Sequence, residues 1–345
     1  MRVERIHACS ILMEDLETVL ARALDDAGVP AVPVVVPTPW DVGEVAAYLF
    51  PHEPVTLVDS GMDSPAGREA FQAALGSHGL TPADVSRVII THAHTDHFGG
   101  AMWLQREAGC EVLLHTADIA MTSYFDSREA AHDLFLPLGF DEELLRRFLD
   151  DGFEFCAPDF TPLEDGAVYR TGGTTLRAEH HPGHTAGHVW VVDESSGAIF
   201  VGDYVIADHP TNAGLEIDRS QPSGRAPLLE QYNAGLRELA DRRAPVLFPA
   251  HGPPITDHAT LIRRRLAKTD RRTRSVLRAL QDAPGVTALE LGRRMYRSRA
   301  ETSWEVISDL VGRLDLLVAQ GQATALMGED GAWHFRADQG GNRDA

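Results

Sequence analysis

Cysteine is scarce in this sequence: three cysteines stand among 345 residues, and no two of them form a C-x-x-C pair. This scarcity argues against a disulfide-stapled scaffold and against a zinc site built on cysteine pairs, so we expect free buried thiols at Cys9, Cys110 and Cys156. Long hydrophobic runs are also missing. The apolar stretch 31–36 is interrupted by proline and is far shorter than the roughly 20 residues that cross a bilayer. The first residues lack the apolar segment of a signal peptide, so we expect a cytoplasmic protein without a membrane partner.

Positive charge is in short supply as well. The 31 lysines and arginines face 51 aspartates and glutamates, which gives a formal net charge of −20. Such a balance argues against a protein whose whole surface grips nucleic acid or an anionic membrane. The basic residues are unevenly placed, however, because twelve of them stand between Arg263 and Arg299, against three acidic residues. Nucleic acid therefore stays open as a partner of this segment alone.

Metal-binding side chains are, by contrast, crowded into one stretch. Four of them lie within six positions: His92, His94, Asp96 and His97. They follow the β-branched run 85–90, which predicts a buried strand, and they precede two glycines and a helix expected over 101–109. Such a density of ligand types on a strand-to-helix turn favours a metal site over a loop of unrelated histidines.

The spacing within this stretch divides the ligands between two ions. Residues two apart on extended backbone point to the same side, so His92 and His94 can share one ion. Asp96 and His97 come after the turn has begun and can serve a second ion beside the first. Imidazole nitrogens with a carboxylate suit a borderline metal such as zinc.

Three further ligand candidates stand where predicted strands give way to loops: His184, Asp203 and His251. His184 lies between the strands expected over 174–179 and 189–193. Asp203 follows the strand 198–201, and His251 ends a strand that begins at Val246. We therefore expect all three side chains to meet at one edge of a sheet.

The rest of the first 260 residues alternates strands with helices, as layered α/β proteins do. The exception is the segment 116–160, which is rich in phenylalanine and has helical spacing over 141–150. Two interpretations stay open for it: a helical insert that packs on the core, or a wall of the pocket beside the metals.

The character of the chain changes near residue 260. Helices are expected over 260–282, 287–296 and 303–320, followed by a hairpin of 323–327 and 332–336. Three helices and a β-ribbon are typical of a winged helix. We therefore predict a catalytic domain over 1–259, a winged-helix-like domain over 260–337 and a disordered tail over 338–345.

Taken together, these motifs resemble those of the metallo-β-lactamase superfamily: the histidine-rich stretch at 92–97, Pro182-Gly183-His184-Thr185, Gly202-Asp203 and Ala250-His251-Gly252. The resemblance covers roughly residues 50–255, and the C-terminal segment resembles, more weakly, that of the LACTB-type and glyoxalase II-like hydrolases. It implies an αββα sandwich with two metal ions at one edge. These would be zinc, with iron or manganese as the other choices.

The resemblance also implies a role for each ligand. The first ion would be held by three imidazoles: His92, His94 and His184. The second would be held by Asp96, His97 and His251. Asp203 would bridge both ions, and Asp96 would in addition orient the attacking hydroxide.

Three neighbours of the ligands have two interpretations each. His188 is either a substrate or outer-shell contact or an ordinary packed side chain. Tyr204 either reaches the substrate or packs in the core. Asp59, at the end of its strand, either accepts a hydrogen bond from a ligating imidazole or shapes a turn.

The ligand set implies a hydrolase in which a hydroxide bridging two zinc ions attacks the substrate. We expect a small-molecule acyl substrate, a thioester or ester of the acyl-CoA or S-acyl-glutathione type, and we leave a homo-oligomer open. The alternative is a single-strand RNA endonuclease that docks RNA on the basic winged helix. Further alternatives are a lactonase and a mononuclear iron persulfide dioxygenase. A binding module without chemistry is disfavoured by the intact ligand set.

Overall fold

The computed structural model describes residues 14–124, 128–149 and 157–338. Several expectations lie outside these residues: Cys9 and Cys156 as free thiols, three phenylalanines of the insert and the tail beyond Asp338. Cys110 is a buried free thiol, as expected. Among the described residues, no helix combines the length and the apolar character that crossing a membrane requires.

One sheet has six strands in sequence order: β1 Val32–Val36, β2 Val45–Phe50, β3 Val55–Val58, β4 Val85–Ile89, β5 Glu111–His115 and β6 Phe160–Leu163. The first three strands are antiparallel, and β3 to β6 are parallel. The interior strand β2 is buried along its whole length, which its apolar sequence VAAYLF explains. This strand was missing from the sequence-based prediction.

The other sheet has five strands in the order β11 Leu247–Pro249, β10 Ile199–Gly202, β9 Val189–Asp193, β8 Thr174–His180 and β7 Val168–Thr171. Because β9 is antiparallel to both β8 and β10, and β11 is parallel to β10, three strands run in one direction: β8, β10 and β11. Their carboxyl ends therefore lie at the same edge of the sheet, as the sequence predicted for the segments that follow them.

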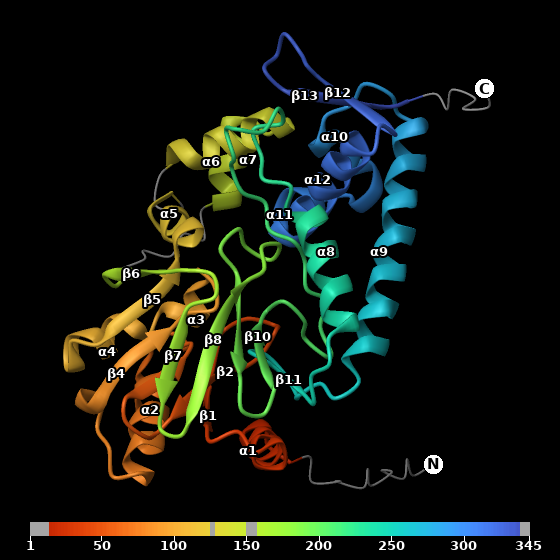
Figure 1. Ribbon diagram of the computed structural model, residues 1–345. Helices are drawn as coiled ribbons and strands as arrows, with labels where there is room; N and C mark the ends of the chain where they lie inside the picture. Colours follow the sequence, from red (N-terminus) through yellow and green to blue (C-terminus); the bar gives the residue numbers. More distant parts are fainter. Residues whose placement is uncertain (1–13, 125–127, 150–156, 339–345) are drawn as a thin grey trace, which may run out of the picture.

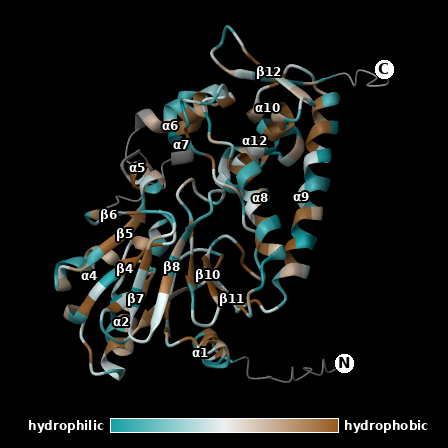
Figure 2. Ribbon diagram, in the orientation of Figure 1, coloured by the Kyte–Doolittle hydropathy of each residue, from teal (hydrophilic) through white to brown (hydrophobic). Residues whose placement is uncertain are grey.

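Helices cover the outer faces of both sheets (Figure 1). The helices of the first 260 residues are α1 Leu16–Ala27, α2 Pro65–Ser77, α3 Thr95–Phe98, α4 Ala101–Ala108, α5 Thr116–Tyr124, α6 Arg128–Phe135, α7 Glu142–Leu149, α8 Leu228–Asp241 and the start of α9 His258–Gln281, with short 3-10 turns at Pro82–Asp84 and Leu136–Leu138. Strands β4 and β5 are largely brown in Figure 2, whereas α9 carries much teal.

The core between the two sheets confirms the four-layer αββα architecture. Side chains of one sheet, such as Tyr48 and Phe50, pack there against side chains of the other, such as Phe200 and Phe248. The centroid of the Tyr48 ring lies 4.6 Å from that of Phe200. Separate apolar clusters hold α2 and α4 on one outer face and α8 and α9 on the other.

The C-terminal segment consists of α9, α10 Ala288–Tyr296, α11 Arg299–Thr302, α12 Trp304–Ala319 and a hairpin of β12 Ala323–Met327 and β13 Trp333–Ala337. The short helix α11 was not predicted. A winged helix and the domain boundary near 260 stay predictions.

The insert shares its core with this C-terminal segment. Phe135 and Phe140 are buried in one apolar cluster with residues of α9, α10 and α12, and the Phe135 ring lies 5.5 Å from that of Trp304. The packing interpretation therefore applies to these two phenylalanines. Trp304 is the first residue of α12, and it also lines a cleft together with His94, Asp96 and Asp203. The helix α12 therefore begins beside the edge of the sandwich where the predicted metal ligands lie.

Candidate metal centre

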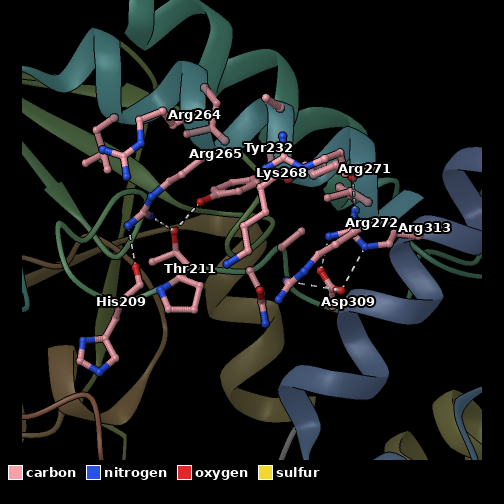
Figure 3. A pocket seen from close by; sticks show the side chains of 18 of the residues that line it. His209, Thr211, Tyr232, Arg264, Arg265, Lys268, Arg271, Arg272, Asp309 and Arg313 are labelled. Carbon is pink, nitrogen blue, oxygen red and sulfur yellow. Dashed lines mark hydrogen bonds and ion pairs between the residues drawn. The ribbon is translucent and has the colours of Figure 1, made fainter. Parts of the chain in front are cut away.

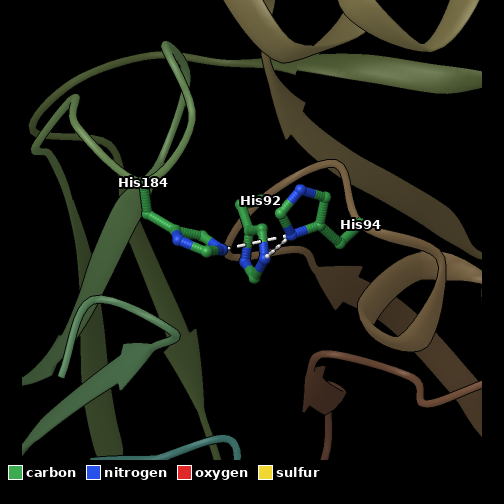
Figure 4. Close-up of side chains that lie close together, drawn as sticks. All are labelled: His92, His94 and His184. Atoms are coloured by element: carbon green, nitrogen blue, oxygen red, sulfur yellow. Dashed lines mark hydrogen bonds between the residues drawn. The ribbon is translucent and has the colours of Figure 1, made fainter. Parts of the chain in front are cut away.

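Three imidazoles converge from two loops that lie far apart in the sequence (Figure 4). His92 and His94 stand in the loop between β4 and α3, and His184 stands between β8 and β9. Nε2 of His92 lies 2.9 Å from Nδ1 of His94, which in turn lies 3.1 Å from Nε2 of His184. The nitrogens can therefore point at one common ion.

A second group lies beside the first. Its members are Asp96 and His97, in the first turn of α3, and His251, after β11. Oδ2 of Asp96 lies 3.2 Å from Nε2 of His251, and Oδ1 of Asp96 lies 3.8 Å from Nε2 of His97. Asp203, which follows β10, faces both groups. Its Oδ1 lies 3.6 Å from Nε2 of His97, and its Oδ2 lies 3.9 Å from Nε2 of His184.

Hydrogen bonds to the far ring nitrogens decide which nitrogen faces the centre. Nδ1 of His97 contacts Oδ2 of Asp59 at 2.9 Å, and Nδ1 of His184 contacts the carbonyl of Asn212 at 2.9 Å. Nδ1 of His251 contacts the carbonyl of Glu44 at 2.8 Å. Because these oxygens only accept, each Nδ1 carries the proton, and in a neutral ring Nε2 presents a lone pair. This is the tautomer that a metal ligand requires.

His92 is oriented through a relay. The Thr91 hydroxyl donates to Oδ2 of Asp59 at 2.9 Å and lies 3.0 Å from Nδ1 of His92. The backbone amide of Thr91 also donates to Oδ1 of Asp59 at 2.8 Å. Asp59 has φ of 60°, a conformation that few residues other than glycine adopt. Both interpretations of Asp59 therefore hold, because it shapes the turn after β3 and orients two imidazoles.

Glycine is required next to Asp203. A Cβ on Gly202 would lie 2.7 Å from Oγ1 of Thr91 and 3.0 Å from Nε2 of His188, and its φ is +51°. Glycine at this position lets the end of β10 approach the end of β4, so that Asp203 reaches the histidines of the other sheet.

The electrostatics differ between the two groups. Burial, followed by repulsion from neighbouring imidazoles, lowers the pKa of His92 well below its usual value and that of His94 to about 3. These rings are therefore neutral, as metal ligands must be. Burial works against the charge of His97 too, but Asp96, Asp203 and Asp59 outweigh it and raise its pKa. The second group thus carries an excess of negative charge that a cation would balance.

Three buried polar atoms support the fit of a cation: Nε2 of His97, Nε2 of His251 and Oδ1 of Asp203. None of them has a hydrogen-bond partner among the described residues. Orphaned buried donors and acceptors are costly, and native proteins rarely retain them without reason. These atoms converge from different elements, and their types are those that zinc prefers, so the residues fit a divalent metal.

A cleft of about 890 Å³ opens onto this edge. His94, Asp96 and Asp203 form part of its lining, together with the polar residues Asp41, Thr95, Thr122 and Glu305. The large apolar side chains of its walls are Trp40, Val42, Phe98 and Trp304. The insert contributes Thr122 and Ala157 to the lining, while Phe135 and Phe140 belong to the core instead. The apolar wall thus comes from parts of the chain that the sequence analysis had not singled out.

Two predicted site residues lie behind the ligands. His188 is fully buried and stacks on His92, with ring centroids 5.1 Å apart. Tyr204 is also fully buried, and its hydroxyl donates to the carbonyl of Pro182 at 3.2 Å. Neither belongs to the described lining of the cleft. This placement favours packing for Tyr204 and support of the His92 ring for His188.

One buried carboxylate of the site, Asp118 of α5, was not predicted from the sequence. Its Oδ2 accepts hydrogen bonds from the Ala93 amide and the Thr185 hydroxyl, both at 2.8 Å, and its Oδ1 accepts one from the Gly187 amide at 2.5 Å. Asp118 thereby ties the loop of His92 and His94 to the loop of His184. Its position just after β5, at the same edge of the sheet as the ligands, was the available signal.

Comparison with known proteins agrees with this geometry. The family model described as metallo-beta-lactamase superfamily matches residues 40–251. The probable metallo-hydrolase YqjP of Bacillus subtilis (strain 168) is 29% identical over 303 residues, which are 85% of this chain and 94% of that protein. An atrochrysone carboxyl ACP thioesterase of Emericella nidulans is 28% identical over 65% of this chain, a match that spans 56% of the thioesterase.

A solved structure extends the likeness over most of the chain. A metallo-beta-lactamase family protein of Thermus thermophilus has a TM-score of 0.74 and 26% identity, and the match covers 90% of this chain and 99% of that one. The resemblance predicted from the motifs is thus confirmed. The chain belongs to the metallo-beta-lactamase superfamily, a family of metal-dependent hydrolases.

Proposed function

We propose that this enzyme hydrolyses a thioester or ester of an acyl group at a dinuclear zinc site. The observation that carries the proposal is the cleft of about 890 Å³, whose lining combines apolar side chains with His94, Asp96 and Asp203. Apolar walls of this kind suit an acyl chain, and the polar residues lie where its carbonyl would be cleaved.

In this proposal, His92, His94 and His184 would hold one ion, Asp96, His97 and His251 would hold the other, and Asp203 would serve both. Bound zinc supplies a Lewis acid and lowers the pKa of a coordinated water towards neutrality. Asp59 keeps the His97 ring in the tautomer that presents Nε2 to the centre. Asp118 holds the two histidine loops at a fixed separation, so that little reorganisation is needed when substrate enters.

Asp96 would also act on the attacking water. Burial raises the pKa of Asp96, but the neighbouring His97 and His251 outweigh it and lower the pKa, so Asp96 stays a carboxylate. A carboxylate in the lining of the cleft accepts a hydrogen bond from water. This hydrogen bond orients the water so that a lone pair of the water oxygen faces the carbonyl carbon of the substrate.

The choice of a thioester has two supports. The cleft has apolar walls, and a curated relative is named as an acyl-carrier-protein thioesterase. The acidic character of the whole chain, with a net charge of −20, disfavours the long polyanions that a nuclease would bind.

A substrate panel tests the proposal. Zinc-loaded protein is incubated with acyl-CoA, S-acyl-glutathione, aryl esters, lactones and single-stranded RNA, and the metal content is measured on the same sample. Hydrolysis of thioesters or esters at two zinc ions per chain supports the proposal. Cleavage of lactones or RNA alone would contradict it, and one iron per chain with persulfide oxidation would replace it with a dioxygenase.

A further inference from the structure

A second cavity, of about 430 Å³, lies between α9, α12 and the loop 207–213 (Figure 3). Its lining is strongly basic. Six cationic side chains contribute to it: Arg264, Arg265, Lys268, Arg271, Arg272 and Arg313. Two acidic residues, Asp208 and Asp309, also line it. In a chain with a net charge of −20, this excess of positive charge marks a site for an anion.

The cationic side chains divide into two kinds. The guanidinium groups of Arg265 and Arg313 already have partners within the protein. Arg265 donates to the carbonyl of His209 at 2.6 Å, and Arg313 pairs with Asp309 through two nitrogens. Lys268 has no carboxylate partner among the described residues, and Arg272 lies 3.9 Å from Asp309. Lys268 and Arg272 are one turn apart on α9, so both face the cavity. Lys268 is therefore available to a ligand, and Arg272 keeps a long ion pair with Asp309.

The basic cavity is a neighbour of the metal cleft. The side chain of Asn212, in the lining of the cavity, donates to the carbonyl of Glu305, in the lining of the cleft, at 3.3 Å. The carbonyl of Asn212 is the same one that holds Nδ1 of His184. Along α12, Glu305 in the cleft and Arg313 in the cavity are separated by about 12 Å, at 1.5 Å per residue.

We propose that this cavity binds the phosphate end of the carrier to which the acyl group is attached. The inference rests on the proposed thioesterase function and deepens it. Acyl thioesters are carried on long arms that end in phosphate, either in a free nucleotide coenzyme or on a carrier protein. An arm that crosses Asn212 would place its thioester in the cleft and its phosphate beside Lys268 and Arg272.

The shape of the site favours a compact anion over a strand of RNA. A volume of about 430 Å³ is in the range of small-ligand pockets, and the cations surround one cavity. Single-strand binding proteins instead use a basic groove with stacked aromatic side chains. Apart from the imidazole of His209, the described lining of this cavity contains one aromatic ring, that of Tyr232, whose hydroxyl donates to the carbonyl of Tyr204 at 2.7 Å.

Binding of a phosphate-bearing fragment tests the cavity without any turnover. Adenosine 3′,5′-bisphosphate is titrated calorimetrically into zinc-loaded wild type and into Lys268→Ala/Arg272→Ala. The matched control is Arg263→Ala/Arg274→Ala, which removes the same charge from exposed positions of α9 outside the cavity lining. We expect the first double variant to weaken binding at least about tenfold and the control to leave it near wild type. Equal affinity in all three proteins, or binding to none, overturns the proposal.

Kinetics separate this inference from the proposed function. S-acyl-N-acetylcysteamine keeps the thioester and lacks phosphate, whereas acyl-CoA and an acylated carrier protein have both. We expect Lys268→Ala/Arg272→Ala to raise KM for the phosphate-bearing substrates and to leave turnover of the truncated one unchanged. The substrate with the larger rise identifies the carrier as coenzyme or protein.

Each contrary outcome has its own meaning. An equal loss on truncated and phosphate-bearing substrates would overturn the phosphate site but leave the thioesterase intact. Failure of every thioester would overturn the proposed function, while the titration would still decide whether the cavity binds phosphate. Salt-dependent binding of single-stranded RNA that is lost in the double variant, with KM for acyl-CoA unchanged, would overturn the inference in favour of RNA.

Discussion

Oδ2 of Asp59 lies 2.9 Å from Nδ1 of His97, and both side chains are buried. The same oxygen accepts the hydroxyl hydrogen of Thr91, which lies next to His92. One carboxylate therefore orients an imidazole of each proposed metal group. Because Asp59 is not among the described residues that line the cleft, its role can be separated experimentally from ligation and from contact with substrate.

Replacing Asp59 tests this outer contact. In Asp59→Asn one oxygen becomes an amino group that cannot accept the hydrogen bonds of His97 and Thr91. We expect metal affinity to fall about 10- to 100-fold, the range for lost partners of metal-bound histidine. Competition with a chromogenic zinc chelator measures the change. Asp241→Asn, at an exposed carboxylate, is the control, and equal zinc affinity in both variants would contradict the assigned role.

Removal of the Asp118 carboxylate is expected to loosen both histidine loops. Asp118→Ala leaves the amides of Ala93 and Gly187 and the Thr185 hydroxyl without their acceptor. Each unsatisfied buried group costs about 1–3 kcal/mol, so urea unfolding should show a loss of several kcal/mol. A loss below about 1 kcal/mol would show that water replaces the carboxylate at little cost.

We expect the protein to lose stability at high pH because of the buried carboxyl of Glu216. Burial, then repulsion from Asp118, raises the pKa of this carboxyl to about 8, against the hydrogen bond from the Ala186 amide. Because the folded pKa lies above the unfolded value, the contribution to stability is complete below about pH 4.5 and is lost as the pH rises through about 8. Urea unfolding of chelator-treated protein at pH 6 and pH 9 measures this loss of stability.

An isosteric variant of Glu216 tests whether this carboxyl is the group that causes the loss. We expect Glu216→Gln, which does not ionise, to lose less stability than wild type between these two pH values. Parallel losses in the two proteins would show that another group is responsible.

Gly202 is the last residue of β10, and Gly197 stands two residues before the strand begins. Both have positive φ, but only Gly202 is crowded. A Cβ at Gly202 would lie 2.7 Å from Oγ1 of Thr91, whereas the nearest atom to a Cβ at Gly197 is 3.7 Å away. Conformational strain is common to both alanine variants. The free energy of unfolding of Gly202→Ala should therefore be lower than that of Gly197→Ala by the cost of overpacking, about 1–3 kcal/mol. Equal free energies of unfolding in the two variants would contradict this expectation and would mean that Thr91 moves away from the added methyl group at little cost.

The fold and the proposed ligands were predictable because local signals and topology agree. His92, Asp203 and His251 each follow a short apolar strand, and parallel strands bring such positions to one edge. The interior strand β2 was missed because Pro51 and Pro54 follow it closely and its buried residues show no alternation. Helix α8, from Leu228 to Asp241, was missed although its leucines recur at helical spacing.

The walls of the cleft could not be predicted, because they depend on packing between distant segments. Trp40 and Trp304 line one cleft although more than half of the chain separates them. Phenylalanine content alone did not distinguish a pocket wall from a core, and Phe135 and Phe140 belong to the core. Asp118 carried no motif around it, so its contacts with two loops emerged only from the folded chain.

The proposed hydrolysis depends on Asp203, which we propose joins the two metal groups into one hydrolytic centre. Zinc content and thioester turnover of Asp203→Ala, measured on the same folded sample, test it most directly. We expect two zinc ions per chain in wild type, fewer in the variant, and turnover lower by orders of magnitude with the fold retained. Wild-type turnover in a folded Asp203→Ala protein would contradict it.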